Sequence, residues 1–104
     1  MAEQTYLIIA NGQWPEKEIW KPLVEDATHI VACDGAAHQC LKNQVEIGTV
    51  IGDMDSLSTE IQNQIQQNST VQFLRQESQE ENDLVKAIRW SIGKDVSSIE
   101  IIGI

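Results

Sequence analysis

Short apolar runs alternate with amphipathic segments along all 104 residues, and this alternation constrains the fold more than any other feature of the sequence. Each run is three to five residues long, which suits a strand and is too short for a buried helix. Hydrophobicity that is mostly continuous is typical of strands covered on both faces. Strands are therefore predicted at residues 6–10, 29–33, 49–51, 71–74 and 98–102.

The segments between these runs carry helix signals. Ser58 is a predicted N-cap, Ser78 and Glu81 have the spacing of a capping box, and Gly93 is a predicted helix stop. Pro22 weakens the first helix because proline has no amide hydrogen to donate. Helices are predicted at residues 16–27, 36–42, 58–67 and from the capping box to 92. The first has an apolar face of Ile19, Leu23 and Val24. The last is expected to bury Leu84, Ile88 and Ile92.

This order of elements predicts an α/β fold in a single domain over residues 1–104. Strands that alternate with helices form a mainly parallel sheet, because each helix returns the chain to the same end of the sheet. Helices then cover both faces, so we expect a three-layer αβα, Rossmann-like architecture. Hydrophobic residues make up 41% of the chain, which is enough for a modest core in a domain of this size.

Polar and acidic residues directly follow four of the predicted strands. In open parallel sheets, ligands bind beyond the carboxyl ends of the strands, and these ends share one edge. We therefore expect four clusters to converge on a common binding site: Asn11-Gly12, Asp34-Gly35-Ala36-Ala37, Gly52-Asp53-Met54-Asp55-Ser56 and Gln76 to Asp83.

The third cluster holds two carboxylates, Asp53 and Asp55, two positions apart. In an extended backbone both point the same way, and two like charges this close are unfavourable unless a cation lies between them. A hard cation such as Mg²⁺ binds one or two carboxylates together with water and phosphate oxygens. Glu80 and Asp83 are spaced i, i+3 at a helix start and can complete the metal site. The competing interpretation is that Asp55 or Ser56 only caps the next helix.

Asp34 has two interpretations of its own. Three small residues follow it, and they leave the backbone open to a substrate. Alternatively, Asp34 is the N-cap of the helix predicted at 36–42. The sequence alone leaves both open.

The chain is acidic, with 16 Asp and Glu against 7 Lys and Arg and a formal net charge of −9. Nucleic acids and anionic membranes require a basic face, so neither is an expected partner. The charge balance favours a site where a divalent cation bridges carboxylates and phosphates. The sequence has no signal-peptide pattern and no apolar run near the roughly 18 residues of a membrane span. Together with two cysteines that lack metal-site spacing, Cys33 and Cys40, this favours a cytoplasmic protein with reduced thiols.

The other side chains able to carry chemistry are expected to be structural. His29 and His38 have no partners at metal-ligand spacing. Trp14, Trp20 and Trp90 have no interleaved basic residues and are expected in the core or at an interface rather than as stacking platforms. Neither a P-loop nor a dinucleotide-binding fingerprint is present in the sequence.

Taken in order, the four clusters resemble those of thiamine pyrophosphokinases. That family carries an Asn-Gly turn after the first strand, a DGA-type loop, a GDxDS loop and a DxxTD-type helix start. The corresponding residues here are Asn11-Gly12, Asp34-Gly35-Ala36, Gly52-Asp53-Met54-Asp55-Ser56 and Glu80-Glu81-Asn82-Asp83. The GDxDS element is the most specific single match, and the ordered set is more specific than any one member.

The resemblance implies a reaction: transfer of a pyrophosphoryl group from ATP to the hydroxyl of thiamine, giving thiamine diphosphate and AMP. It also implies Mg²⁺ as cofactor and a homodimer in the full-length protein. Such a transfer depends on positioning and charge neutralisation more than on a covalent nucleophile. By motif position, the implied metal ligands are Asp53, Asp55, Glu80 and Asp83; the implied catalytic acids are Asp34, Asp53, Asp55 and Asp83; and the implied nucleotide contacts are Asn11, Gly12, Gly35, Ser56 and Gln79.

Two positions depart from the family pattern. Asn82 stands where threonine is usual and Glu80 where aspartate is commoner, and each keeps a hydrogen-bonding group or a charge. The next family motif, a GGRxDH-type segment, is expected after Ile104, followed by a β-rich C-terminal domain that helps to bind thiamine at a dimer interface. We therefore expect residues 1–104 to be the N-terminal α/β catalytic domain and to be inactive alone.

Two other functions fit parts of the sequence. Asp53-Met54-Asp55 resembles the DxD motif of haloacid-dehalogenase-like phosphatases, with Asp53 as nucleophile. That family places its DxD after the first strand, whereas this one follows the third predicted strand. The second alternative is a non-catalytic α/β domain whose acidic edge binds a partner.

Overall fold

Five parallel strands form a single sheet in the order β4-β3-β2-β1-β5. The computed structural model describes residues 4–52, 58–68, 71–75 and 83–104. The predicted α/β class is confirmed, and each pair of neighbouring strands among the described residues is parallel. The strands are β1 (Thr5–Ile9), β2 (His29–Cys33), β3 (Thr49–Gly52), β4 (Gln72–Arg75) and β5 (Ser98–Ile102).

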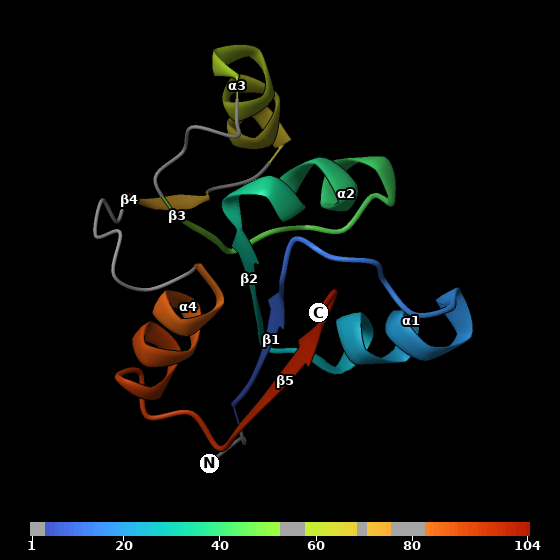
Figure 1. The fold of residues 1–104 in the computed structure, drawn as a ribbon, viewed down its shortest axis with the longest axis vertical. Helices are drawn as coiled ribbons and strands as arrows, with labels where there is room; N and C mark the ends of the chain where they lie inside the picture. Colours follow the sequence, from blue (N-terminus) through green and yellow to red (C-terminus); the bar gives the residue numbers. More distant parts are fainter. Residues whose placement is uncertain (1–3, 53–57, 69–70, 76–82) are drawn as a thin grey trace.

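Helices cover both faces of this sheet, which confirms the predicted three layers. Three helices lie on one face and one on the other (Figure 1). The arrangement follows from right-handed crossovers. The steps β1 to β4 all move in one direction and place their helices on one face, while the return step from β4 to β5 places its helix on the other. The helices are α1 (Lys17–Asp26), α2 (Ala37–Lys42), α3 (Thr59–Asn68) and α4 (Asp83–Ile92), with a 3-10 turn η1 (Asp34–Ala36) before α2.

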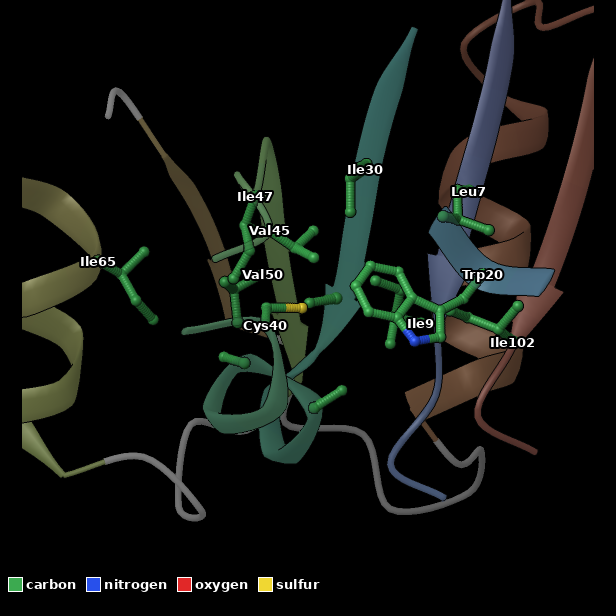
Figure 2. Close-up of a cluster of buried hydrophobic side chains, with 13 residues drawn as sticks. Leu7, Ile9, Trp20, Ile30, Cys40, Val45, Ile47, Val50, Ile65 and Ile102 are labelled. Atoms are coloured by element: carbon green, nitrogen blue, oxygen red, sulfur yellow. The ribbon is translucent and has the colours of Figure 1, made fainter. Parts of the chain in front are cut away.

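The two faces of the sheet bury two separate apolar clusters. Along β1, Leu7 and Ile9 pack toward α1 to α3, whereas Ile8 packs toward α4, and all three are fully buried. The larger cluster brings Trp20 of α1, Cys40 of α2 and Ile65 of α3 together over the sheet (Figure 2). Because the central strands are buried on both faces, they read as continuous apolar runs in the sequence.

The predicted buried faces of two helices are partly wrong. In α1, Trp20 is the buried residue and Ile19 is 55% exposed, because Trp20 packs edge-to-face on Trp14 with ring centroids 5.1 Å apart. In α4, Ile92 is 64% exposed. The fully buried residues of α4 are Ala87 and Ser91, whose small side chains let the helix approach the sheet closely.

Most of the predicted helix ends agree with the structure. Pro22 lies inside α1 without ending it. Ser58 is a true cap, because its hydroxyl oxygen accepts a hydrogen bond from the amide of Ile61 at 3.2 Å. The predicted capping residues Ser78 and Glu81 lie outside the described residues. Among the described helices, none combines the length and the hydrophobicity that a membrane span requires.

Candidate functional site

The candidate site lies at the carboxyl edge of the sheet, where the parallel strands all end. Asn11 and Gly12 follow β1, Asp34 and Gly35 follow β2, and Gly52 is the last residue of β3. In the order β3-β2-β1, these three strands are neighbours. The structure therefore brings together the first two predicted clusters and Gly52, the first residue of the third, whereas residues 53–56 lie outside the described residues.

The loop after β2 meets the end of β3 where Asp34 packs against Gly52. Asp34 is 3% exposed, and its Oδ1 accepts a hydrogen bond from the amide of Gly35 at 2.6 Å. A Cβ atom added to Gly52 would lie 2.8 Å from both Cγ and Oδ2 of Asp34. Gly52 also has a φ of +148°, which other residues adopt only with strain. Glycine is thus favoured at this position on two grounds, and the Asp34 carboxyl lies beside the last residue of β3.

The helix-cap interpretation of Asp34 is wrong for α2. Ala36 is the N-cap residue of α2, and no side chain caps that end. Asp34 is instead the first residue of η1, with its carboxyl oxygen held by the adjacent Gly35 amide. A buried carboxylate that does not cap the helix fits a role in a binding site.

The loops after β1 and β2 meet where Asn11 covers Gly35. A Cβ atom on Gly35 would lie 2.6 Å from Cγ and 3.0 Å from Oδ1 of Asn11. A larger residue at position 35 would therefore force the Asn11 side chain to move. Asn11 nevertheless remains an exposed residue. Its amide therefore lies at the surface beside the Asp34 loop.

The turn after β1 is also fixed by β5 and by α2. Gly12 lies against the carbonyl of Gly103, and the amide of Ala10 donates to the carbonyl of Ile102 at 2.8 Å. From α2, the side-chain Nε2 of Gln39 donates to the carbonyl of Gly12 at 3.1 Å. Gln39 was not among the predicted site residues. Neither residue type nor spacing links a helix position to a turn 27 residues away in the chain.

Most of the remaining predicted site residues fall outside the part of the chain that the structure describes. Asp53, Asp55, Ser56, Gln79 and Glu80 lie outside the described residues, and Asp83 is the first residue of α4. Within the described ranges, no group of three or more His, Cys, Asp or Glu side chains is arranged to hold a metal ion. The predicted metal ligands therefore remain a prediction.

His29 has a structural setting at the opposite, amino edge of the sheet. Its Nε2 lies 2.8 Å from the Thr49 hydroxyl, and its ring packs against Tyr6 and Trp90 with centroid distances of 4.9 and 6.0 Å. Burial, with a smaller contribution from the nearby Lys94 ammonium, lowers the pKa of His29 below its usual value.

Neither cysteine forms a disulfide bond, and both are buried. Cys33 ends β2, and Cys40 lies on α2 within the larger apolar cluster. Burial raises the pKa of the Cys40 thiol to about 12, so this thiol stays protonated near neutral pH and is a poor nucleophile and metal ligand.

Comparisons with known proteins agree on one family. The family model described as thiamin pyrophosphokinase, catalytic domain, matches residues 20–104. Among solved structures, thiamin pyrophosphokinase from yeast is 24% identical with a TM-score of 0.70, over 88% of this chain and 32% of that one. Thiamine pyrophosphokinase from Bacillus subtilis is 22% identical with a TM-score of 0.75, over 97% of this chain and 47% of that one. A thiamin pyrophosphokinase family protein from Enterococcus faecalis is 21% identical with a TM-score of 0.76, over 96% and 46%.

The similarity covers only part of each solved structure. The chain spans less than half the length of each of these three solved structures. No curated protein sequence matches this chain significantly. Neither the phosphatase interpretation of Asp53 nor the non-catalytic interpretation gains support from them.

Proposed function

This chain belongs to the thiamin pyrophosphokinase catalytic-domain family, and from that premise we propose that it forms the nucleotide-handling part of an Mg²⁺-dependent enzyme. The enzyme transfers the pyrophosphoryl group of ATP to the hydroxyl of thiamine and releases thiamine diphosphate and AMP. ATP and thiamine are the proposed substrates.

The observation that carries the proposal is the meeting of the loops after β1 and β2 with the end of β3 at one edge. The Asn11 amide rests on Gly35, and the Asp34 carboxyl rests on Gly52. These contacts bring the two loops and the strand end close together. A polyphosphate needs several donors and a counter-charge within a short distance, and loops at the carboxyl ends of parallel strands supply both.

The carboxylates suit a hard cation. Asp34 places a buried carboxyl beside Gly52, and Asp53 and Asp55 follow Gly52 in the sequence. Such oxygen donors are the ligands that Mg²⁺ prefers. We propose that Asp53, Asp55, Glu80 and Asp83 hold the cation. When bound, it neutralises charge between the carboxylates and the phosphate oxygens.

The neutral residues of the same loops have a different proposed role. Asn11, Gly12 and Gly35 lie at the edge where the phosphates would rest, and the two glycines let the neighbouring backbones pack closely behind the exposed Asn11 amide. Ser56 and Gln79 are proposed to contact ATP as well. One carboxylate among Asp34, Asp53, Asp55 and Asp83 would accept the thiamine hydroxyl proton as a general base.

Assembly and location belong to the same proposal. We place the protein in the cytoplasm, where the buried thiols of Cys33 and Cys40 would stay reduced. We propose a homodimer for the full-length protein, which sedimentation analysis tests directly. Nucleic acids and membranes are not proposed partners, since the net charge is −9.

Calorimetric titration with ATP tests the site. Wild-type protein is expected to bind ATP in the presence of Mg²⁺ and to lose most of that affinity when EDTA removes the cation. Asp53→Asn is expected to weaken Mg²⁺-dependent ATP binding by at least about tenfold, because a charged contact contributes about 1.5–3 kcal/mol. Full-length protein is then assayed for thiamine diphosphate formation.

Asp26→Asn is the matched control for this titration. It removes the same charge from an exposed position at the end of α1, near the amino edge of the sheet. ATP affinity should be unchanged in this variant. The proposed site would be refuted if ATP bound equally well without Mg²⁺, or if Asp26→Asn weakened binding as much as Asp53→Asn.

A further inference from the structure

The turn at Asn11-Gly12 is fixed from three directions. Gly35 lies directly under the Asn11 amide, and Gly103 lies against Gly12. The third contact comes from α2, where Gln39 Nε2 donates to the Gly12 carbonyl at 3.1 Å. Two of these contacts are van der Waals contacts that prevent inward movement. The Gln39 hydrogen bond is directional and fixes the orientation of the turn.

The Asn11 side chain is available to a ligand. No hydrogen bond joins its amide to another residue in the described ranges, and Asn11 is exposed. An asparagine amide carries two donor hydrogens and one acceptor oxygen. Here this group sits at the carboxyl edge beside the loop that holds Asp34. It can therefore donate to a phosphate oxygen without first breaking a hydrogen bond to a described residue.

The connection between these groups is short. Gln39 lies two residues after Ala37, the first residue of α2, and α2 follows the Asp34–Ala36 turn directly. The helix that carries Gln39 is therefore continuous with the loop that carries Asp34 and Gly35. Any shift of this loop relative to the β1 turn changes the Gln39 to Gly12 distance. One half-buried side chain thus couples the two loops that the proposed site brings together.

We propose that Gln39 is a positioning residue, which orients the Asn11-Gly12 turn so that the Asn11 amide meets a phosphate group of the nucleotide. This inference rests on the proposed function for the identity of the ligand. The geometry of the turn itself does not depend on it. Gln39 touches the turn and acts on the ligand only through Asn11.

Two substitutions at position 39 separate the hydrogen bond from the shape of the side chain. Gln39→Glu keeps the length but replaces the donor with a carboxylate, which repels the Gly12 carbonyl. Gln39→Lys restores a donor of sufficient reach. Asn43→Ala is the control, because it removes another side-chain to backbone hydrogen bond on the same helix, from Asn43 Nδ2 to the Gln39 carbonyl at 2.9 Å.

Two measurements on the whole protein test the inference. The first is the position of the Asn11 side-chain and Gly12 backbone signals in ¹H–¹⁵N NMR spectra without ligand. These signals should shift in Gln39→Glu and return toward wild type in Gln39→Lys. The second is the dissociation constant for Mg²⁺·ATP. It should rise roughly three- to tenfold in Gln39→Glu, as expected for one lost hydrogen bond, recover to about twofold or less in Gln39→Lys, and stay unchanged in Asn43→Ala.

The outcomes distinguish this inference from the proposed function. If wild-type protein does not bind Mg²⁺·ATP, the proposed function fails, and the nucleotide role of Gln39 fails with it. Unshifted Asn11 and Gly12 signals in Gln39→Glu would show that Gln39 does not orient the turn. Equal losses of affinity in Gln39→Glu and Asn43→Ala, or no recovery in Gln39→Lys, would reduce Gln39 to a stabilising residue of α2.

Discussion

At the scale of single residues, His29 makes the stability of the fold depend on pH. Its pKa is lowered in the folded state, mainly by burial. The unfolded chain therefore takes up a proton at higher pH than the folded protein. The contribution of His29 to the free energy of unfolding is fully present above the usual histidine pKa near 6.5. It is lost as the pH falls from there through the lower pKa of the folded state. We therefore expect the free energy of unfolding to decrease as the pH is lowered through this range.

His29→Gln isolates that contribution, because glutamine keeps a donor for the Thr49 hydroxyl and does not titrate. Urea unfolding at pH 7 and pH 5 should show a smaller loss of stability in this variant than in wild type. Asn43→Ala, which changes an exposed side chain that does not titrate, is the control and should lose as much stability between the two pH values as wild type. Equal losses in all three proteins would contradict the assignment.

The two glycine contacts mark the limit of prediction at this scale. The sequence predicted Gly35 as backbone open to a substrate and Gly52 as a position where a phosphate or another loop comes close. The structure shows that each is covered by a neighbouring loop, Gly35 by Asn11 and Gly52 by Asp34. Each contact joins residues that are far apart in the chain and depends on the register of adjacent strands. Residue type and spacing therefore located these glycines but could not identify what covers them.

At the scale of secondary structure, the strands were predictable and the helix faces less so. Strands β2 and β5 have the predicted bounds, because polar or glycine residues flank their apolar cores. Errors arose for Ile19 and Ile92, which continue an apolar period but lie outside the contact with the sheet. The orientation of a helix depends on which of its side chains let it pack closest to the sheet. In α4 these are Ala87 and Ser91, and a hydrophobic pattern underweights such small residues.

Pro22 is the clearest local cost within a helix. It lies in α1, where its ring nitrogen cannot donate to the carbonyl of Glu18. Pro22→Ala should stabilise the protein by about 1–2 kcal/mol, because a helix-interior proline costs about 3 kcal/mol and its stiffening of the unfolded chain returns up to about 1 kcal/mol. The urea midpoint should rise, with Lys21→Ala as an exposed neighbour that changes it little. A lower midpoint in Pro22→Ala would show that packing of the ring outweighs the missing hydrogen bond.

At the scale of the whole molecule, the sheet order gives the two edges different chemistry. The step from β4 to β5 crosses the sheet and places β5 beside β1, so the direction of winding changes there. At the carboxyl edge, the loops after β1 and β2 and the end of β3 touch through Asn11, Asp34, Gly35 and Gly52. The opposite edge has a hollow of about 440 Å³ lined by Thr28, His29, Glu46 and Gly48, among others. This hollow is the competing candidate for a binding site.

Amide hydrogen exchange can decide between the two edges without any mutation. A ligand that binds the folded protein slows exchange most where it contacts or orders the backbone. Adding Mg²⁺·ATP should therefore slow exchange at Gly12, Gly35 and Gly52 and leave Thr28 and Gly48 nearly unchanged. Magnesium alone and ATP with EDTA are the controls, and each should have a weaker effect. Protection confined to Thr28 and Gly48 would place the nucleotide in the hollow at the amino edge. The meeting of Asn11, Asp34 and their glycines would then be a feature of loop packing, and the acidic segment after Gly52 would need another function.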